Sequence, residues 1–177
     1  MEGLRLKDVA EQVGIQPPSV FAHFEGREAI GDAIAQRILG RIGELLGSAV
    51  VGEGPPAERL RQGARLFAGH LMDHPAHTRL LLRDLTRTRT GSELEMWSPV
   101  VTEIENGIGA LLAEGERSGD FRAIPARAFM AQLEGAILAT IGWMGFQEDG
   151  QPASPLTREE IQAQAEELAM AIVARRP

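Results

Sequence analysis

The sequence predicts an all-α protein, and three observations support this fold class. Apolar residues recur every three or four positions in each long segment, which is the period of an amphipathic helix. Glycines, prolines and hydroxyl side chains stand at the points where these segments begin or end. With 44% hydrophobic and 24% charged residues in a chain of 177, the composition is that of a globular protein that can build its own core.

The first two predicted helices are short and are separated by a tight turn. Residues 6–13 have apolar side chains at helical spacing, and Gly14 follows where a left-handed C-cap is favoured. Pro17 and Pro18 suit the first turn of a second helix over residues 17–23. This order is typical of a helix-turn-helix, whose second helix enters the major groove of DNA. An ordinary corner between two bundle helices is the alternative.

The second helix and its surroundings supply the residues expected to contact DNA. Val20 and Phe24 are also expected to face the small core of this N-terminal headpiece, because apolar residues alternate with polar ones here. Arg27 stands near the start of the next helix, where it can meet a phosphate. The DNA-binding candidates are Gln16, Pro17, Ser19, Val20, Phe21, Ala22, His23 and Arg27.

Three more helices are predicted between residues 27 and 88. Isoleucine and leucine at helical spacing predict the first over residues 27–46, and the Gly- and Pro-rich residues 47–56 are predicted to form a linker. The second, over residues 57–73, is expected to end or kink at Pro75, and the third follows over residues 76–88.

A long helix is predicted over residues 92–117. Ser92 is its expected N-cap, with Glu95 at the capping-box position. Pro99 and Gly107 are expected to bend or loosen it.

The last two predicted helices differ in the width of their apolar faces. Residues 125–146 give an apolar surface broader than one core face requires, whereas the C-terminal helix, which Thr157 and Glu160 begin as a capping box, has a narrow stripe. One broad and one narrow helix are suited to pairing with their copies, so a homodimer through these two helices is expected.

Two segments in the headpiece resemble a known protein family. Val20 to Phe24, VFAHF, and Arg27 to Ile30, REAI, resemble the DNA-binding domain of TetR-type transcriptional regulators. Two later segments, Asp73 to Pro75 and Glu116 to Arg122, are also similar to that family. The resemblance implies a headpiece and connecting helix over residues 1–46 and a ligand-binding, dimerising domain over residues 47–177. The implied function is a repressor that binds operator DNA and is released by a small-molecule effector.

The headpiece departs from the family pattern in three respects. Family members usually carry a further helix ahead of the motif, whereas Met1 stands almost at the motif, so we expect most of that helix to be lacking. Phe21 stands where the family often has Tyr, and Pro17 stands where it usually has Lys.

The charge of the chain also bears on DNA binding. The net charge is −7, and residues 1–41 hold five Lys and Arg against six Asp and Glu. DNA affinity depends strongly on cations at phosphates. The alternative is therefore a helical ligand-binding or interaction protein that does not bind DNA.

The resemblance further implies a pocket among the middle helices for a largely apolar effector. Core packing is the alternative role for each of its candidate residues, and polar candidates for effector recognition are His70, Thr102, Glu103 and Gln132. The pocket candidates are Phe67, His70, Leu71, Met96, Trp97, Val100, Ile104, Phe129, Leu133 and Trp143.

The sequence gives little support for an enzyme, a metal site or a cofactor. His70, His74 and His77 have the spacing of one helix face, but Pro75 interrupts it and the chain has no cysteine. No phosphate-binding loop or nucleophile motif is present, so a helical metalloprotein or enzyme using these histidines remains only an alternative. Because there is neither a signal peptide nor a long apolar run, a cytoplasmic location without membrane contact is expected.

Overall fold

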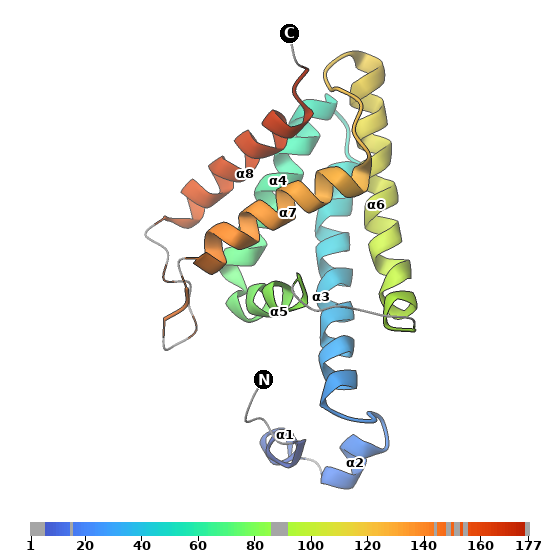
Figure 1. The fold of residues 1–177 in the computed structure, drawn as a ribbon, viewed down its shortest axis with the longest axis vertical. Coiled ribbons are helices and arrows are strands. Elements are labelled where there is room, and N and C mark those ends of the chain that lie inside the picture. Colours follow the sequence, from blue (N-terminus) through green and yellow to red (C-terminus); the bar gives the residue numbers. More distant parts are fainter. Residues whose placement is uncertain are drawn as a thin grey trace. The chain divides into compact units, whose positions relative to one another are not determined.

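The computed structural model describes residues 6–14, 16–85, 92–143, 145–147, 150, 153 and 156–175. Every regular element that spans several of these residues is a helix, which confirms the all-α fold class (Figure 1). The chain divides into two compact units, Met1–Arg37 and Ile38–Pro177, and each is described by itself. None of the helices within the described ranges combines the length and apolarity needed to cross a bilayer.

The first unit contains α1 (Leu6–Val13), α2 (Pro17–Phe21) and the beginning of α3 (Arg27–Val50). Gly14, with φ of 72°, ends α1 as predicted, because only glycine adopts this left-handed conformation without cost. The helix α2 is two residues shorter than expected, since Ala22 is already its C-cap. Ala10 and Val20 are buried where α1 packs against α2.

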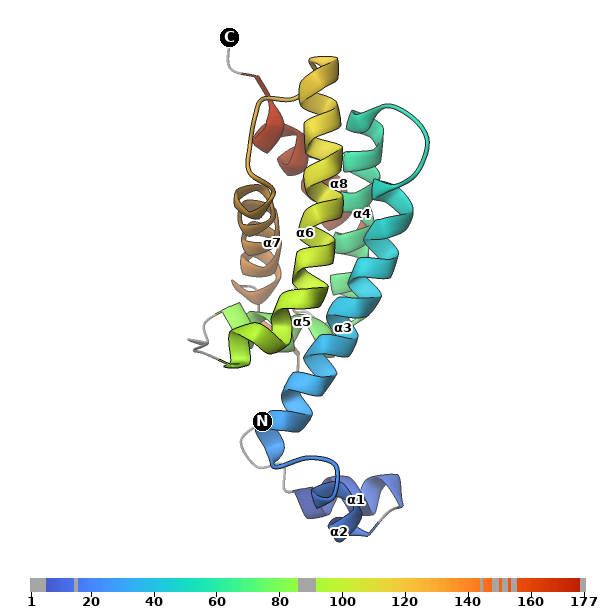
Figure 2. The same cartoon turned by 90° about the vertical axis from the view of Figure 1, so that its right-hand side faces the viewer.

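The second unit contains the rest of α3 and five further helices. Figure 2 shows the body part of α3 running roughly alongside α6, with α7 on the other side of α6. The five helices are α4 (Pro56–Asp73), α5 (Pro75–Leu85), α6 (Ser92–Ser118), α7 (Ala126–Trp143) and α8 (Arg158–Val173).

The helix α8 packs along α4. A Cβ atom on Gly69 of α4 would lie 2.6 Å from Nε2 of Gln162, so the side chain of Gln162 occupies the space that a larger residue at position 69 would fill. Gln162 donates from Nε2 to the carbonyl of Arg65 at 3.1 Å. Arg158 donates through two nitrogens to both oxygens of Asp73, each at 2.7 Å.

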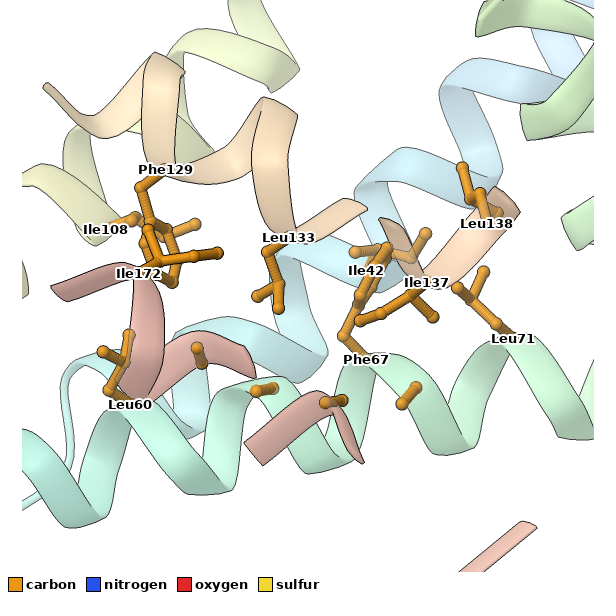
Figure 3. Packing of buried hydrophobic residues seen from close by; sticks show 14 of the residues in the cluster. Ile42, Leu60, Phe67, Leu71, Ile108, Phe129, Leu133, Ile137, Leu138 and Ile172 are labelled. Atoms are coloured by element: carbon orange, nitrogen blue, oxygen red, sulfur yellow. The ribbon is translucent and has the colours of Figure 1, made fainter. Parts of the chain in front are cut away.

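The core of the second unit draws on all of its helices. Figure 3 shows Phe67 extending from α4 to meet Ile42 of α3 and Ile137 of α7. The largest fully buried apolar side chains are Leu71, Leu111, Phe121, Phe129, Leu138, Ile141 and Val173.

Several predicted boundaries need correction. The helix α3 continues to Val50, because Ala49 and Val50 are buried and their packing outweighs the weak helix propensity of Gly47. The predicted linker is therefore reduced to residues 51–55, and residue 46 lies inside a helix. The division into functional domains at residues 46 and 47 stays a prediction.

The predicted bounds of α6 and the predicted start of α8 lie within one residue of the observed ones, whereas α7 ends at Trp143 and not at residue 146. The predicted end of the helix over residues 76–88 lies outside the described residues. The capping box of α8 is present: Thr157 Oγ1 accepts from the N–H of Glu160, and Glu160 accepts from the N–H of Thr157 at 2.7 Å. The side chains of Ser92 and Glu95 lie outside the described residues, although α6 does begin at Ser92.

Candidate functional site

The helix-turn-helix of the first unit presents a short polar surface. The backbone of Gln16 is extended, and its carbonyl accepts from the N–H of Ser19 at 2.9 Å as α2 begins. After α2, the N–H groups of His23 and Phe24 both bond to the carbonyl of Val20, which closes the turn.

The structure separates the DNA-binding candidates into groups. Gln16, Ser19, Ala22 and His23 are exposed, so their side chains are available to a partner. Val20 is only 6% exposed and belongs to the headpiece core, as expected from the alternation of apolar residues, and its role as a DNA contact stays a prediction. The side chains of Pro17, Phe21 and Arg27 lie outside the described residues.

The positive charge of Lys7, on α1 of the headpiece, is paired with a neighbouring carboxylate. Lys7 forms an ion pair with Glu11 at 3.7 Å, one helical turn away, and both side chains are well exposed. Such a pair contributes little to stability but offsets the charge that a phosphate would meet.

A second candidate site is an apolar cavity between α3, α4, α6 and α7 in the second unit. Its volume is about 80 Å³, and it is partly open to solvent. Its wall consists of Leu39, Ile42, Leu46, Val50, Arg59, Leu60, Gly63, Ala64, Phe67, Ile104, Ile108, Leu111, Phe129, Met130, Leu133 and Glu134. Figure 3 shows Leu133 pointing from α7 toward α4.

Four of the predicted pocket residues, Phe67, Ile104, Phe129 and Leu133, line this cavity. The side chains of Met96 and Trp97 lie outside the described residues. His70, Leu71 and Val100 are absent from the wall; Leu71 is fully buried in the core. The polar candidates Thr102, Glu103 and Gln132 are exposed and do not line it either.

Trp143, which was also predicted to line the pocket, is absent from the wall of this cavity. Its side chain is 91% exposed. The reason is its position on α7, where Leu138 and Ile141 occupy the core-facing side and leave Trp143 on the outer side.

The most informative residues of the cavity wall that sequence reasoning missed are Arg59 and Glu134. Arg59 Nη1 donates to Oε2 of Glu114 at 2.8 Å and Nη2 donates to the carbonyl of Val50, so its charge is paired. Burial raises the pKa of Glu134, and no charged neighbour offsets this effect. One signal was present in the sequence, because Glu134 is the only acidic residue in the largely apolar helix α7.

The three histidines near Pro75 come together in space. The ring centres of His70, His74 and His77 lie 4.5 to 5.3 Å apart, and Nδ1 of His77 is 3.2 Å from Nε2 of His70. Burial, followed by the charges of His74, His77 and Arg41, lowers the pKa of His70 to about 4. Within the described part of the chain, no His, Cys, Asp or Glu group has an arrangement that could hold a metal ion.

The outer side of α7 and α8 forms a third surface, which we call the α7–α8 face. A shallow groove between the two helices is lined by Ala136, Thr140, Gln164 and Leu168, together with buried neighbours. The exposed Trp143 lies one turn beyond Thr140. The groove is bordered by small and uncharged side chains, which suits close helix packing.

Comparison with known proteins decides the family. Residues 53–173 match the family model described as Tetracyclin repressor-like, C-terminal domain. The chain belongs to the TetR family. This TetR chain has no significant match among curated protein sequences.

Solved structures share the fold of this TetR chain at low sequence identity. A transcriptional regulator of the TetR/AcrR family from Thermobifida fusca is 20% identical with a TM-score of 0.70, and the alignment covers 96% of this chain and 87% of that one. FadR from Bacillus subtilis, solved in complex with stearoyl-CoA, is 14% identical with a TM-score of 0.74, covering 97% and 88%. AibR, solved with isovaleryl coenzyme A and operator DNA, is 19% identical with a TM-score of 0.70, covering 94% and 87%.

Proposed function

We propose that this TetR-family chain is a DNA-binding transcriptional regulator whose operator affinity is controlled by a small, largely apolar effector. The observation that carries the proposal is the helix-turn-helix with Gln16, Ser19 and His23 exposed on and beside α2, in a chain whose remainder matches the TetR family. Second helices of this kind read base edges through their first exposed side chains.

The cavity supports the effector part of the proposal. Its wall is apolar apart from Arg59 and Glu134, and four different helices contribute to it. Leu39, Ile42 and Leu46 belong to α3, the helix that begins in the headpiece unit. A ligand that contacts these residues would favour one position of α3 over others, and would regulate DNA affinity by that difference in binding free energy. The complexes of FadR and AibR with acyl-CoA compounds are precedents for ligand binding in this fold.

We further propose a homodimer through α7 and α8. The α7–α8 face is uncharged in its groove and carries the exposed Trp143, which a second copy would cover. A two-fold dimer places two headpieces on successive half-sites of an operator, which one headpiece cannot do. We also propose that the chain is not an enzyme and that it is located in the cytoplasm.

A second candidate is a ligand-binding protein that does not bind DNA. It is favoured by the near balance of charges in residues 1–41 and by the Lys7–Glu11 pair. Fluorescence anisotropy with a labelled duplex from the region upstream of the chain's own gene separates the two, measured at low and at physiological salt. The regulator binds specifically, with affinity that falls steeply as salt rises. Absence of specific binding at both salt concentrations would favour the second candidate.

A further inference from the structure

Glu134 is the ionisable group of the cavity that has no protein partner. It lies on α7 next to the cavity-lining Leu133 and one turn after Met130, and it is partly buried. Among the described residues, none forms a hydrogen bond or an ion pair with its carboxyl group. A carboxyl group held at an apolar wall without a partner costs stability, so a ligand that supplies the partner gains that free energy on binding.

The other charged group of the wall does not balance Glu134. Nη1 and Nη2 of Arg59, whose side chain is 12% exposed, already donate to the carboxylate of Glu114 and to the carbonyl of Val50. The positive charge is therefore paired, although the buried Nε has no hydrogen-bond partner among the described residues. Among the described wall residues, Arg59 and Glu134 are the only ionisable ones. The charge that remains unpaired at the cavity is therefore negative when Glu134 is ionised.

Two aromatic rings line the same cavity as this carboxyl group. Phe67 from α4 and Phe129 from α7 are both in the cavity wall, and Figure 3 shows them on opposite sides of Leu133. Aromatic faces attract cations electrostatically, and most strongly where water is excluded.

We propose that the cavity selects apolar effectors that carry one positive charge, and that Glu134 binds this charge. The inference rests on the proposed function, because it concerns the same cavity and specifies the chemistry of its ligand. It also separates this chain from the acyl-CoA complexes of FadR and AibR, since a polyanionic ligand would meet an unpaired carboxylate and no free cation in the described wall.

The test uses three probes that share a decyl chain and differ in the head group: decyltrimethylammonium, 1-decanol and decanoate. Each is titrated into the full chain below its micelle concentration, and its affinity is measured by displacement of the neutral fluorophore N-phenyl-1-naphthylamine. We expect the cation to bind about tenfold more tightly than the alcohol, a difference of about 1.4 kcal/mol. The anion should bind most weakly.

Substitution of Glu134 identifies the source of the preference. Glu134→Gln keeps the shape of the side chain and should reduce the ratio of cation to alcohol affinity to about one, with alcohol affinity unchanged within about twofold. Glu134→Met, similar in size and apolar, should act in the same way. Glu103→Gln, which removes an exposed carboxylate outside the wall, is the matched control and should keep the wild-type ratio.

Two results would overturn the inference: equal binding of cation and alcohol by the wild type, or an unchanged ratio in both Glu134 variants. If the three probes bind equally and Ala64→Phe, which fills the cavity, abolishes their binding, the cavity remains an effector site and only the charge preference fails. If no probe binds, the effector site fails with it, whereas specific binding of the duplex would still support the regulator.

Discussion

Gly115 shows how one residue can fix the direction of the chain between two helices. It lies in the last turns of α6, and its carbonyl accepts from the N–H groups of Asp120 and Phe121 at 2.9 and 3.0 Å. The ring of Phe121 is fully buried against it: a Cβ atom on Gly115 would lie 2.0 Å from Cδ2 of that ring. The turn before α7 therefore depends on the absence of a side chain at this position.

Gly115→Ala should destabilise the protein by about 1–3 kcal/mol, because the added methyl group overlaps a ring that has no room to move. Gly47→Ala is the matched control, since a Cβ atom there meets nothing within 4 Å. In a helix interior that change should stabilise by ~0.5–1 kcal/mol. Urea unfolding measures both, and equal free energies of unfolding for Gly115→Ala and the wild type would contradict the packing described.

The histidines at the α4–α5 junction should make stability depend on pH. The pKa of His70 falls from 6.5 to about 4 in the folded chain, so the unfolded chain binds more protons between these values. Above pH 6.5 His70 does not affect the free energy of unfolding. As the pH falls from 6.5 toward 4, protonation of the unfolded chain lowers this free energy progressively. His77, whose pKa burial also lowers, acts in the same direction.

The unfolding temperature of the wild type should therefore drop more between pH 7 and pH 5 than that of His70→Asn. Asp73 does not interfere, because the hydrogen bond from Arg158 lowers the pKa of that carboxyl below 3.8. Glu134, whose raised pKa acts in the opposite direction, is present in both proteins. His23→Asn, at an exposed histidine of the first unit, should follow the wild type. Parallel pH curves for the wild type and His70→Asn would show that the histidine cluster is not coupled to folding.

At the scale of elements, the sequence predicted where helices lie better than where they meet. Hydrophobic periodicity and local chemistry located α1, α4 and α8, because Gly14, Pro75 and Thr157 act on their own neighbours. Periodicity did not predict that α3 supplies one wall of the cavity, since that depends on which distant faces pack together. The outward position of Trp143 and the continuation of α3 to Val50 were missed for the same reason.

A substitution in the α7–α8 face tests whether these two helices form the dimer interface. Gln164→Arg places a charge in the groove, and in the proposed dimer two-fold symmetry would bring that charge close to the same region of the second copy. We expect the dimer dissociation constant to rise by about a hundredfold, as when a central interface residue is disrupted. Ala163→Arg, at an exposed position of α8 outside the groove, should leave the dimer intact.

Sedimentation equilibrium measures both proteins at matched concentrations. A wild-type chain that is monomeric at micromolar concentration, or a Gln164→Arg chain that dimerises as strongly as Ala163→Arg, would contradict assembly through this face. Circular dichroism confirms that both variants stay helical, so that a loss of mass can be assigned to dissociation.

At the scale of the whole molecule, the proposed DNA-reading unit and the proposed effector-binding unit share one helix. The helix α3 belongs to both compact units, and its second half lines the cavity. Because the net charge is −7, we expect the proposed DNA affinity to come from the local surface around α2 and from the proposed dimer rather than from the overall field.

The measurement that tests this account most directly is duplex binding by a headpiece variant and a charge-matched control. Gln16→Glu with Ser19→Glu adds two negative charges at exposed positions beside and on α2, whereas Gln62→Glu with Thr102→Glu adds the same charge at exposed positions of α4 and α6. Anisotropy with the labelled upstream duplex should show about tenfold or greater loss of affinity for the first pair, because carboxylates there face phosphates. The control pair should bind within about twofold of the wild type. Equal affinity for the two variants, or no specific binding by the wild type, would contradict the assignment of α2 as the DNA-reading helix.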